Sequence, residues 1–420
     1  MNRRFFLLTG AVAMVQPGVA DMPYGPAQAP GAPYTRSGDP AFDAWAQAFA
    51  AKALAVGIPE ATLRREFADL RPDLSIVNAD RGQPELVRSV GDYMSRAVSD
   101  LKIQQGRARM SELSSWLNRC EQRYGVPASI LVGVWGMESA YGAIQGDNDV
   151  VRSLATLAYE GRRRAWAETQ LVAALRILAE GRIPRGRLKG SWAGAMGQTQ
   201  FIPQTYLDTA VDGDEDGRRD IWGSPQDALA SAANLLAKAG WRRGESWARE
   251  VILPRGFDYS LAEGPRYPVS GWLEMGVRAA GNRSWSAADS AAEAQLILPA
   301  GASGPAFLAL PNHFVIRAYN NSTSYALAVG LLADGVAGRP GLVAQWPVEA
   351  PMTLADRRGA QEALNRLGYP VGEPDGVIGT KTRAAVRAWQ KATGITADGH
   401  LTLELSRRLQ AQVASAPSGR

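Results

Sequence analysis

The stretch that decides the fold is Ile130-Leu-Val-Gly-Val-Trp-Gly-Met-Glu-Ser-Ala-Tyr-Gly142, an apolar run with one carboxylate, Glu138, near its end. Pro127 suits the first position of a helix, where its missing N–H costs nothing. Up to Met137 this helix is apolar on nearly all sides, which predicts burial. An isolated buried carboxylate tends to keep its proton, and a protonated carboxyl is what a general acid requires. The alternative is a structural ion pair with an arginine such as Arg152.

Two further motifs follow this helix. Ser191-Trp-Ala-Gly-Ala-Met-Gly-Gln-Thr-Gln-Phe-Ile-Pro203 begins 53 residues beyond Glu138, and Tyr319-Asn-Asn-Ser-Thr-Ser-Tyr325 comes later in the chain. Together with the run from Trp135 to Gly142, these motifs resemble, in order and spacing, the lytic murein transglycosylases of the B type. The resemblance covers residues 40–338.

This resemblance implies a lysozyme-like catalytic domain of the α+β class, predominantly α. It also implies an enzyme that cleaves the β-1,4 bond between N-acetylmuramic acid and N-acetylglucosamine in peptidoglycan. The product carries a 1,6-anhydro end, no water is consumed, and Glu138 is implied as the single acid and base. The residues implied to bind substrate are Tyr93, Ser191, Gln200, Tyr319, Asn320 and Tyr325. Leu235 departs from the family pattern, because well-known members carry a tyrosine there.

Two other functions fit the sequence less well. A hydrolytic muramidase would use Glu138 and a water, but the motifs contain no second acid, which ordinary glycosidases place about 5–9.5 Å away. A non-catalytic scaffold that binds the cell wall is disfavoured, because Glu138, Ser191 and Gln200 are all present. A zinc-dependent wall enzyme lacks its ligands, since His313 and His400 are the only histidines.

The run Gly194-Ala-Met-Gly197 lies between the two polar residues of the second motif. Its small side chains would let a sugar ring approach the backbone closely. Tight internal packing is the alternative explanation, because it requires glycine for the same steric reason.

Asp212-Gly-Asp-Glu-Asp-Gly217 has the opening of a calcium-binding loop, with carboxylates at alternate positions and glycine at the sixth. The twelfth position is Gly223, where an EF-hand has glutamate, and the resemblance implies that Asp227 closes the site with the backbone oxygen of Arg218. The predicted ligands of a structural Ca²⁺ are Asp212, Asp214, Asp216, Arg218 and Asp227. The alternative is a metal-free acidic turn partly neutralised by Arg218 and Arg219. No organic cofactor is predicted.

The formal net charge of +5 is unevenly distributed. Between Glu160 and Lys189, eight basic residues stand against three acidic ones. Such a stretch attracts an anionic polymer, for example nucleic acid, a lipid surface or the peptide carboxylates of peptidoglycan. A solvated helix face is the alternative. With the resemblance, the predicted partner is the peptidoglycan glycan strand and no nucleic acid; the sequence identifies no protein partner.

The N-terminus has the pattern of an export signal. Arg3 and Arg4 precede a short apolar stretch, and small residues end at Ala20. The prediction is a signal peptide over 1–20, of Sec or twin-arginine type, with no stable membrane insertion after its cleavage. The expected location is the periplasm of a Gram-negative cell envelope. Cys120 is the only cysteine and lies far from the signal, so neither a disulfide nor a lipoprotein is expected.

Proline and glycine divide the rest of the chain. A Pro/Gly-rich leader over 21–40 precedes the catalytic domain, 41–337, and a linker over 338–351 follows it. Apolar periodicity predicts a helix that begins near Phe42, and others over 60–70, 85–106, 111–124, 127–141, 164–180, 225–239 and 322–336. Short apolar runs between glycines and prolines predict strands over 251–253, 295–298 and 307–310.

Residues 352–412 carry a pattern of their own. Three short helices are predicted over 354–367, 380–393 and 402–410, separated by the turns Asp375-Gly376 and Asp398-Gly399. The segment resembles the small, all-α, three-helix peptidoglycan-binding domain, which implies that it binds the cell wall. The alternative is that it docks on the catalytic domain of its own chain.

Overall fold

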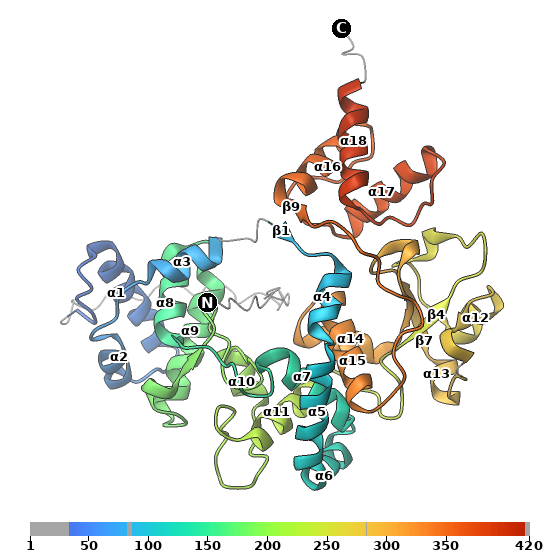
Figure 1. Cartoon of the computed structure of the whole chain (residues 1–420). Helices are drawn as coiled ribbons and strands as arrows, with labels where there is room; N and C mark the ends of the chain where they lie inside the picture. Colours follow the sequence, from blue (N-terminus) through green and yellow to red (C-terminus); the bar gives the residue numbers. More distant parts are fainter. Residues whose placement is uncertain (1–32, 82–85, 283, 416–420) are drawn as a thin grey trace. The chain divides into compact units, whose positions relative to one another are not determined.

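The computed structural model describes residues 33–81, 86–282 and 284–415 (Figure 1). The predicted signal peptide and residues 21–32 of the predicted leader lie outside the described residues. The chain divides into two compact units. Among the described residues, the first comprises 33–81, Leu113–Tyr124 and Val134–Leu235, and the second 86–112, Gly125–Gly133, 236–282 and 284–415.

The first unit is helical. Its elements are α1 (Pro40–Ala55), α2 (Glu60–Phe67), α3 (Leu74–Arg81), α6 (Ser114–Tyr124), β2 (Asn148–Asp149), α8 (Val150–Glu160), α9 (Arg164–Ala179), η1 (Arg185–Arg187), β3 (Lys189–Gly190) and α10 (Pro203–Thr209). Two more helices, α7 (Ala128–Ser139) and α11 (Pro225–Lys238), have residues in both units. The Asp39 carboxylate caps α1 by accepting the N–H groups of Ala41 and Phe42.

The core of the first unit lies among α1, α2, α8, α9 and α10, and α9 packs against α2, α8 and α10. Phe42, Trp45 and Phe49 are buried on one face of α1, as their helical spacing predicts. The Phe49 ring stacks on Phe67 of α2, with centroids 5.8 Å apart. This apolar packing fixes the helices that precede the first motif.

The second unit combines helices with a small sheet. Its elements before the C-terminal module are β1 (Leu86–Val87), α4 (Val90–Ala97), α5 (Asp100–Glu112), β4 (Ala248–Ile252), η2 (Tyr259–Leu261), β5 (Tyr267–Pro268), α12 (Val269–Glu274), β6 (Arg278–Ala279), η3 (Ala280–Asn282), α13 (Ala287–Ala291), β7 (Glu293–Ile297), η4 (Gly301–Ser303), β8 (Ala306–Ala309), α14 (Pro311–Tyr319) and α15 (Thr323–Val336). The antiparallel sheet has the order β5–β7–β8–β4–β6. Its core includes Trp272, Leu296 and Leu308.

One predicted helix is wrong. The span 85–106 forms β1 and two helices, α4 and α5, because serines cap separate N-termini. The Ser89 hydroxyl accepts the N–H of Asp92, and α4 ends where the N–H of Val98 bonds to Met94 O. Residue 85 itself lies outside the described residues.

The other predicted elements are confirmed, with small shifts of their ends. The helix predicted over 60–70 stops at Phe67, and the one predicted over 111–124 begins at Ser114. Strands β4, β7 and β8 overlap the three predicted apolar runs, and each begins one to three residues earlier than predicted. None of the helices over the described ranges combines the length and apolar character that a bilayer span requires.

The C-terminal module consists of β9 (Met352–Thr353), α16 (Leu354–Arg366), α17 (Thr380–Ala392) and α18 (Leu403–Ser415). Thr353 and Asp356 form a capping box at the start of α16. The module has its own apolar core, with buried side chains of Leu364, Trp389 and Leu409. The prediction of three helices is therefore confirmed.

The module also contacts other parts of the second unit. Strand β9 pairs with β1, the Asp398 carboxylate accepts the N–H of Ala302 (2.8 Å), and Arg383 forms a salt bridge with Glu263 (3.0 Å). In the predicted linker, the N–H groups of Val343 and Ala344 bond to the Glu250 carboxylate (2.8 and 2.7 Å). These contacts support the alternative that the module docks on other parts of its own chain. Such docking is compatible with binding of the module to peptidoglycan.

Candidate active site

Glu138 is half-buried in the last turn of α7. The helix ends at Ser139, two residues earlier than predicted, because Ala140, Tyr141 and Gly142 adopt left-handed φ values of 49°, 61° and 84°. Two consecutive non-glycine residues in this region are uncommon and need support from their surroundings. The Tyr141 N–H bonds to Trp135 O (3.2 Å), and the Tyr141 ring packs edge-on against the Trp135 indole.

The side chain of Gln198 joins this turn to the second motif. Its Oε1 accepts a hydrogen bond from Trp135 Nε1 (3.0 Å), and its Nε2 donates to Trp222 O (3.2 Å). Its backbone oxygen accepts from the Ser139 hydroxyl (2.6 Å), which itself accepts the Gly142 N–H (2.9 Å). Gln198 is buried, so these bonds fix the peptide immediately after Glu138.

Close packing explains the glycines around this network. A Cβ at Gly142 would lie 2.5 Å from Gln198 Oε1. Gly194 and Gly197 have left-handed φ values, and a Cβ at either would lie 2.8 Å from Leu154 or Ile221. Tight packing therefore accounts for both glycines, and open space for a sugar is not needed to explain them.

Met196 and Phe201 close a turn by paired backbone hydrogen bonds. Gln200 lies within this turn, and Ser191 precedes it, with its N–H bonded to Ala195 O (2.7 Å). The Ser191 hydroxyl is buried and accepts the N–H of Ala195 (3.1 Å). Gln200 Nε2 donates to Gln145 O (3.0 Å) and Gly197 O (2.8 Å). Its Oε1 is buried and accepts no hydrogen bond from any residue that the structure describes.

The third motif belongs to the second unit. Tyr319 ends α14, Asn320 is extended, and the Ser322 hydroxyl caps α15 by accepting the Tyr325 N–H. The rings of Tyr319 and Tyr325 stack, with centroids 6.4 Å apart and planes inclined by 19°. Tyr93, also predicted to bind substrate, is half-buried on α4 of this unit. The six predicted substrate-binding residues are thus divided between the units.

Arg152 has partners other than Glu138. It donates to Arg71 O (3.0 Å) and lies 4.0 Å from the Asp73 carboxylate. The structural ion pair considered for Glu138 is therefore not formed with this arginine.

The basic stretch before the second motif is largely satisfied within the chain. Arg162 and Arg163 share the Asp80 carboxylate, and Arg185 bridges Glu66 and Asp149. These pairs favour a structural role over an open polyanion site.

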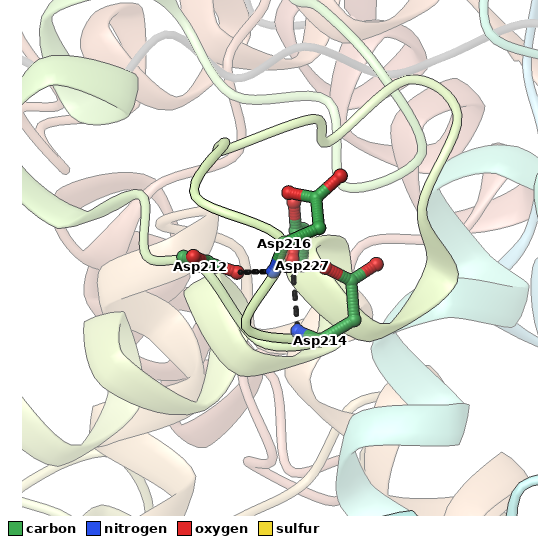
Figure 2. Close-up of side chains that lie close together, drawn as sticks. All are labelled: Asp212, Asp214, Asp216 and Asp227. Atoms are coloured by element: carbon green, nitrogen blue, oxygen red, sulfur yellow. Dashed lines mark hydrogen bonds between the residues drawn. The ribbon is translucent and has the colours of Figure 1, made fainter.

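Four predicted metal ligands converge on one point. Figure 2 shows the side chains of Asp212, Asp214, Asp216 and Asp227 close together. Each offers a carboxylate oxygen, and these oxygens all lie within 4.8 Å of one another. The fifth predicted ligand residue, Arg218, donates its backbone N–H to Asp216 Oδ1 (2.8 Å). Among the described residues this is the one cluster of its kind.

The cluster fits a calcium ion. Each ligand oxygen of a Ca²⁺ ion lies about 2.3–2.6 Å from the metal, so two such oxygens are at most about 5 Å apart. The spacing of the four carboxylates agrees with this limit. Asp227 is fully buried, and burial raises its pKa despite the backbone N–H groups of Gly213, Asp220 and Asp214 that it accepts. Within the described ranges, neither Arg218 nor Arg219 forms a salt bridge with the four aspartates. The arginine-neutralised alternative is therefore not supported.

Comparison with protein families gives two matches. Residues 41–334 match the family described as "Transglycosylase SLT domain", and residues 353–409 match "Putative peptidoglycan binding domain". The chain is similar to "Membrane-bound lytic murein transglycosylase B" of Escherichia coli (strain K12), with 33% identity over 254 residues. The aligned region is 58% of this chain and spans 66% of that relative.

Solved structures are also similar. SltB3 from Pseudomonas aeruginosa, in complex with NAG-anhNAM-pentapeptide, superposes with a TM-score of 0.85 at 48% identity, covering 89% of this chain and 100% of that one. The Escherichia coli lytic transglycosylase Slt35, in complex with calcium, gives a TM-score of 0.60 at 29% identity, covering 70% of this chain and 92% of that one.

Proposed function

The chain belongs to the transglycosylase SLT domain family, and from this premise we propose that it is a peptidoglycan lytic transglycosylase. It cleaves the β-1,4 bond between N-acetylmuramic acid and N-acetylglucosamine and leaves 1,6-anhydro-N-acetylmuramic acid ends. The observation that carries this proposal is Glu138, held at the end of an apolar helix by the Gln198 network. The similarity to SltB3, solved with an anhydro-muropeptide, supports it.

Glu138 acts first as the acid. It donates its proton to the glycosidic oxygen while the bond from that oxygen to C1 of the muramic acid breaks. The oxygen of the substrate's own N-acetyl group shares the positive charge that develops at C1. The Glu138 carboxylate then accepts the proton of the C6 hydroxyl of the same sugar, and the C6 oxygen bonds to C1. Glu138 ends protonated and ready for another cycle, and no water is consumed.

Ser191 and Gln200 position the N-acetyl group in this scheme. The two donors of Gln200 Nε2 are occupied by backbone oxygens, so its buried Oε1 remains to accept a substrate N–H. The Ser191 hydroxyl uses a lone pair to accept the Ala195 N–H and retains its proton to donate. Together the two side chains match an amide, which offers one donor and one acceptor.

The third motif and Tyr93 bind further parts of the glycan. The stacked rings of Tyr319 and Tyr325 offer aromatic surface of the kind that packs against sugar rings, and Asn320 adds a polar amide.

A structural Ca²⁺ is part of this proposal. The carboxylates of Asp212, Asp214, Asp216 and Asp227 would hold it, with the backbone oxygen of Arg218. The ion would neutralise the clustered negative charges and take no part in the reaction. Support comes from the calcium complex of the similar Slt35.

Export to the periplasm and attachment to the wall complete the proposal. The N-terminal signal pattern supports export of the chain to the compartment that contains peptidoglycan. The module that matches a peptidoglycan-binding family would keep the catalytic residues near their polymer.

Substitution of Glu138 tests the proposed chemistry. Glu138→Gln keeps the shape of the side chain but neither gives nor takes a proton, so release of muropeptides from purified sacculi should fall by at least about a thousandfold, in the range of lost acid and base catalysis. Glu274→Gln makes the same change on an exposed residue of α12 and should retain full activity. Substantial activity in Glu138→Gln would assign the acid to another residue.

A further inference from the structure

Two arginines share one aromatic ring of α14, near a glutamate that pairs with a third arginine. Arg266 and Arg317 lie over the ring of Phe314, with guanidinium carbons 4.0 and 5.9 Å from its centroid. Glu263 precedes Arg266 in the chain, and its carboxylate forms a salt bridge with Arg383 of the C-terminal module. The backbone of Glu263 has a left-handed φ of 59°, and its N–H donates a hydrogen bond to Leu296 O (2.8 Å).

Glu263 compensates the positive charge of Arg317 only in part, because its carboxylate is paired with Arg383. Among the described residues neither guanidinium has a carboxylate within salt-bridge distance, since Glu263 is 3.0 Å from Arg383. Arg317 is half-buried, and its Nε is shielded from solvent without a hydrogen-bond partner. Burial, followed by the neighbouring charge of Arg266, lowers the pKa of Arg317, and the charge of Glu263 offsets part of this effect.

The contact with the Phe314 ring offsets little of the repulsion between the guanidinium groups of Arg266 and Arg317. A cation–π contact contributes about 0.5–2 kcal/mol, and two like charges on the same ring oppose each other. An arrangement of this kind is unfavourable in the absence of an anion and favourable in its presence. A bound carboxylate would satisfy the buried Nε of Arg317 and neutralise both guanidinium groups.

The pair lies beside the third motif. Arg317 is on α14, two residues before Tyr319, and its Nη2 donates to Asn321 Oδ1 within that motif (2.6 Å). An anion held by Arg317 would therefore lie next to the residues proposed to bind the glycan.

We propose, on the basis of the proposed function, that Arg266 and Arg317 form a binding site for a carboxylate of the peptide stem carried by muramic acid. Where muramic acid carries a stem, its lactyl carboxyl is tied up as an amide, so the sugar backbone offers hydroxyl and amide groups and the stem peptides supply the free carboxylates. The planar guanidinium fork matches a carboxylate with two parallel hydrogen bonds. The site makes the enzyme prefer glycan that bears peptides with free carboxylates.

Binding to full-length protein that carries Glu138→Gln tests this site without turnover. The ligands are one short glycan in three forms: with peptide stems, with the stem carboxylates converted to amides, and without peptides but with the lactyl carboxyl of muramic acid converted to an amide. The parent protein should bind the first form at least about fivefold more tightly than the other two, in line with a charge-assisted contact. Adding Arg266→Gln should weaken binding of the first form about threefold to fivefold, the range of a partly exposed pair. The other two forms should be unaffected.

Arg255→Gln is the matched control, because it removes the same charge from an exposed arginine of the second unit. Arg317→Lys keeps the charge and removes the fork; it should weaken binding of the carboxylate form alone, with an unchanged melting temperature. Equal affinities of the parent protein for the three forms would overturn the inference, and so would an equal loss for all three in Arg266→Gln. A failure of the proposed function would appear separately, as wild-type protein that releases no anhydro-muropeptides.

Discussion

At the scale of single residues, Gln198 determines where Glu138 is held. Its side chain bonds to the Trp135 indole on the helix of Glu138 and to Trp222 O, and its backbone oxygen bonds to the Ser139 hydroxyl. The turn after Glu138 is left-handed at two non-glycine residues, so it depends on such external bonds. The catalytic carboxyl is therefore positioned by a residue that never needs to touch the substrate.

Replacing Gln198 with leucine should separate this positioning role from simple packing. The change leaves the buried Trp135 Nε1 without a partner, whereas Trp222 O still accepts from Gln145 Nε2, so the free energy of unfolding should fall by about 1–3 kcal/mol in urea titrations. The turnover number should fall more than the KM rises, because the substrate contacts remain. Gln204→Leu, which removes only a solvent-exposed hydrogen bond to Asp208, should alter neither value. Unchanged turnover in Gln198→Leu would remove Gln198 from the account.

At the scale of elements, the acidic loop before α11 is held together from within. Asp227, in the first turn of α11, accepts N–H groups of Gly213, Asp214 and Asp220, and the Trp116 indole of α6 donates to Gly213 O. These bonds bring four carboxylates together, and their mutual repulsion must be offset by a cation or by protons.

Calcium should raise the melting temperature of the protein, and this effect should depend on pH. Because burial raises the pKa of Asp227 above its unfolded value, the protonated carboxyl favours folding. This contribution to the free energy of unfolding is present at low pH and is lost as the pH rises through the folded pKa of Asp227. Above that pKa the buried, ionised carboxylate destabilises the fold, and a bound Ca²⁺ would offset this destabilisation. The calcium-dependent increase in melting temperature should therefore be largest near neutral pH and disappear as the pH falls through the carboxylate range.

Asp216→Asn provides the control for the calcium prediction. It removes one charge from the exposed side of the cluster and should reduce the calcium-dependent increase, whereas Asp100→Asn on α5 should not. Identical melting curves in excess calcium and in chelator at neutral pH would rule out the metal.

The helices differ in how well the sequence predicts their bounds. Apolar periodicity located α9, α11 and α15 to within a residue or two, because each has a long buried face. It failed over 85–106, where Ser89 and Ser99 divide one amphipathic pattern into two helices. Glu138 could be singled out from the residues themselves, as the one carboxylate in an apolar run, and the family resemblance implied the roles of the site residues. Gln198 was missed because its role comes from contacts between segments far apart in sequence.

At the scale of the whole molecule, the predicted family, the α+β class and the lytic transglycosylase function are confirmed by the matches over residues 41–334 and 353–409 and by the similarity to SltB3. The predicted residue roles, domain boundaries and export signal stay predictions. The C-terminal module has a core of its own and also contacts the second unit through Arg383 and Asp398. The module could therefore direct the enzyme to peptidoglycan, stabilise the rest of the second unit, or do both.

Deleting residues 352–420 should distinguish these roles. If the module tethers the enzyme to its polymer, activity on intact sacculi should fall about a hundredfold, at the low end of the gain from tethering, while activity on short soluble glycans changes little. The matched control is Arg383→Gln in the full chain, which removes the salt bridge with Glu263 and keeps the module. Equal losses on both substrates after deletion would show that the module stabilises the catalytic part and does not target it.

The central claim is that Glu138 closes an anhydro ring without water, and the products of the wild-type enzyme test it most directly. Purified sacculi are digested in water enriched in heavy oxygen, and the released muropeptides are analysed by mass spectrometry. The account predicts 1,6-anhydro-N-acetylmuramic acid ends that carry no heavy oxygen from the solvent. Reducing ends labelled with the heavy isotope would contradict it and identify a hydrolytic muramidase.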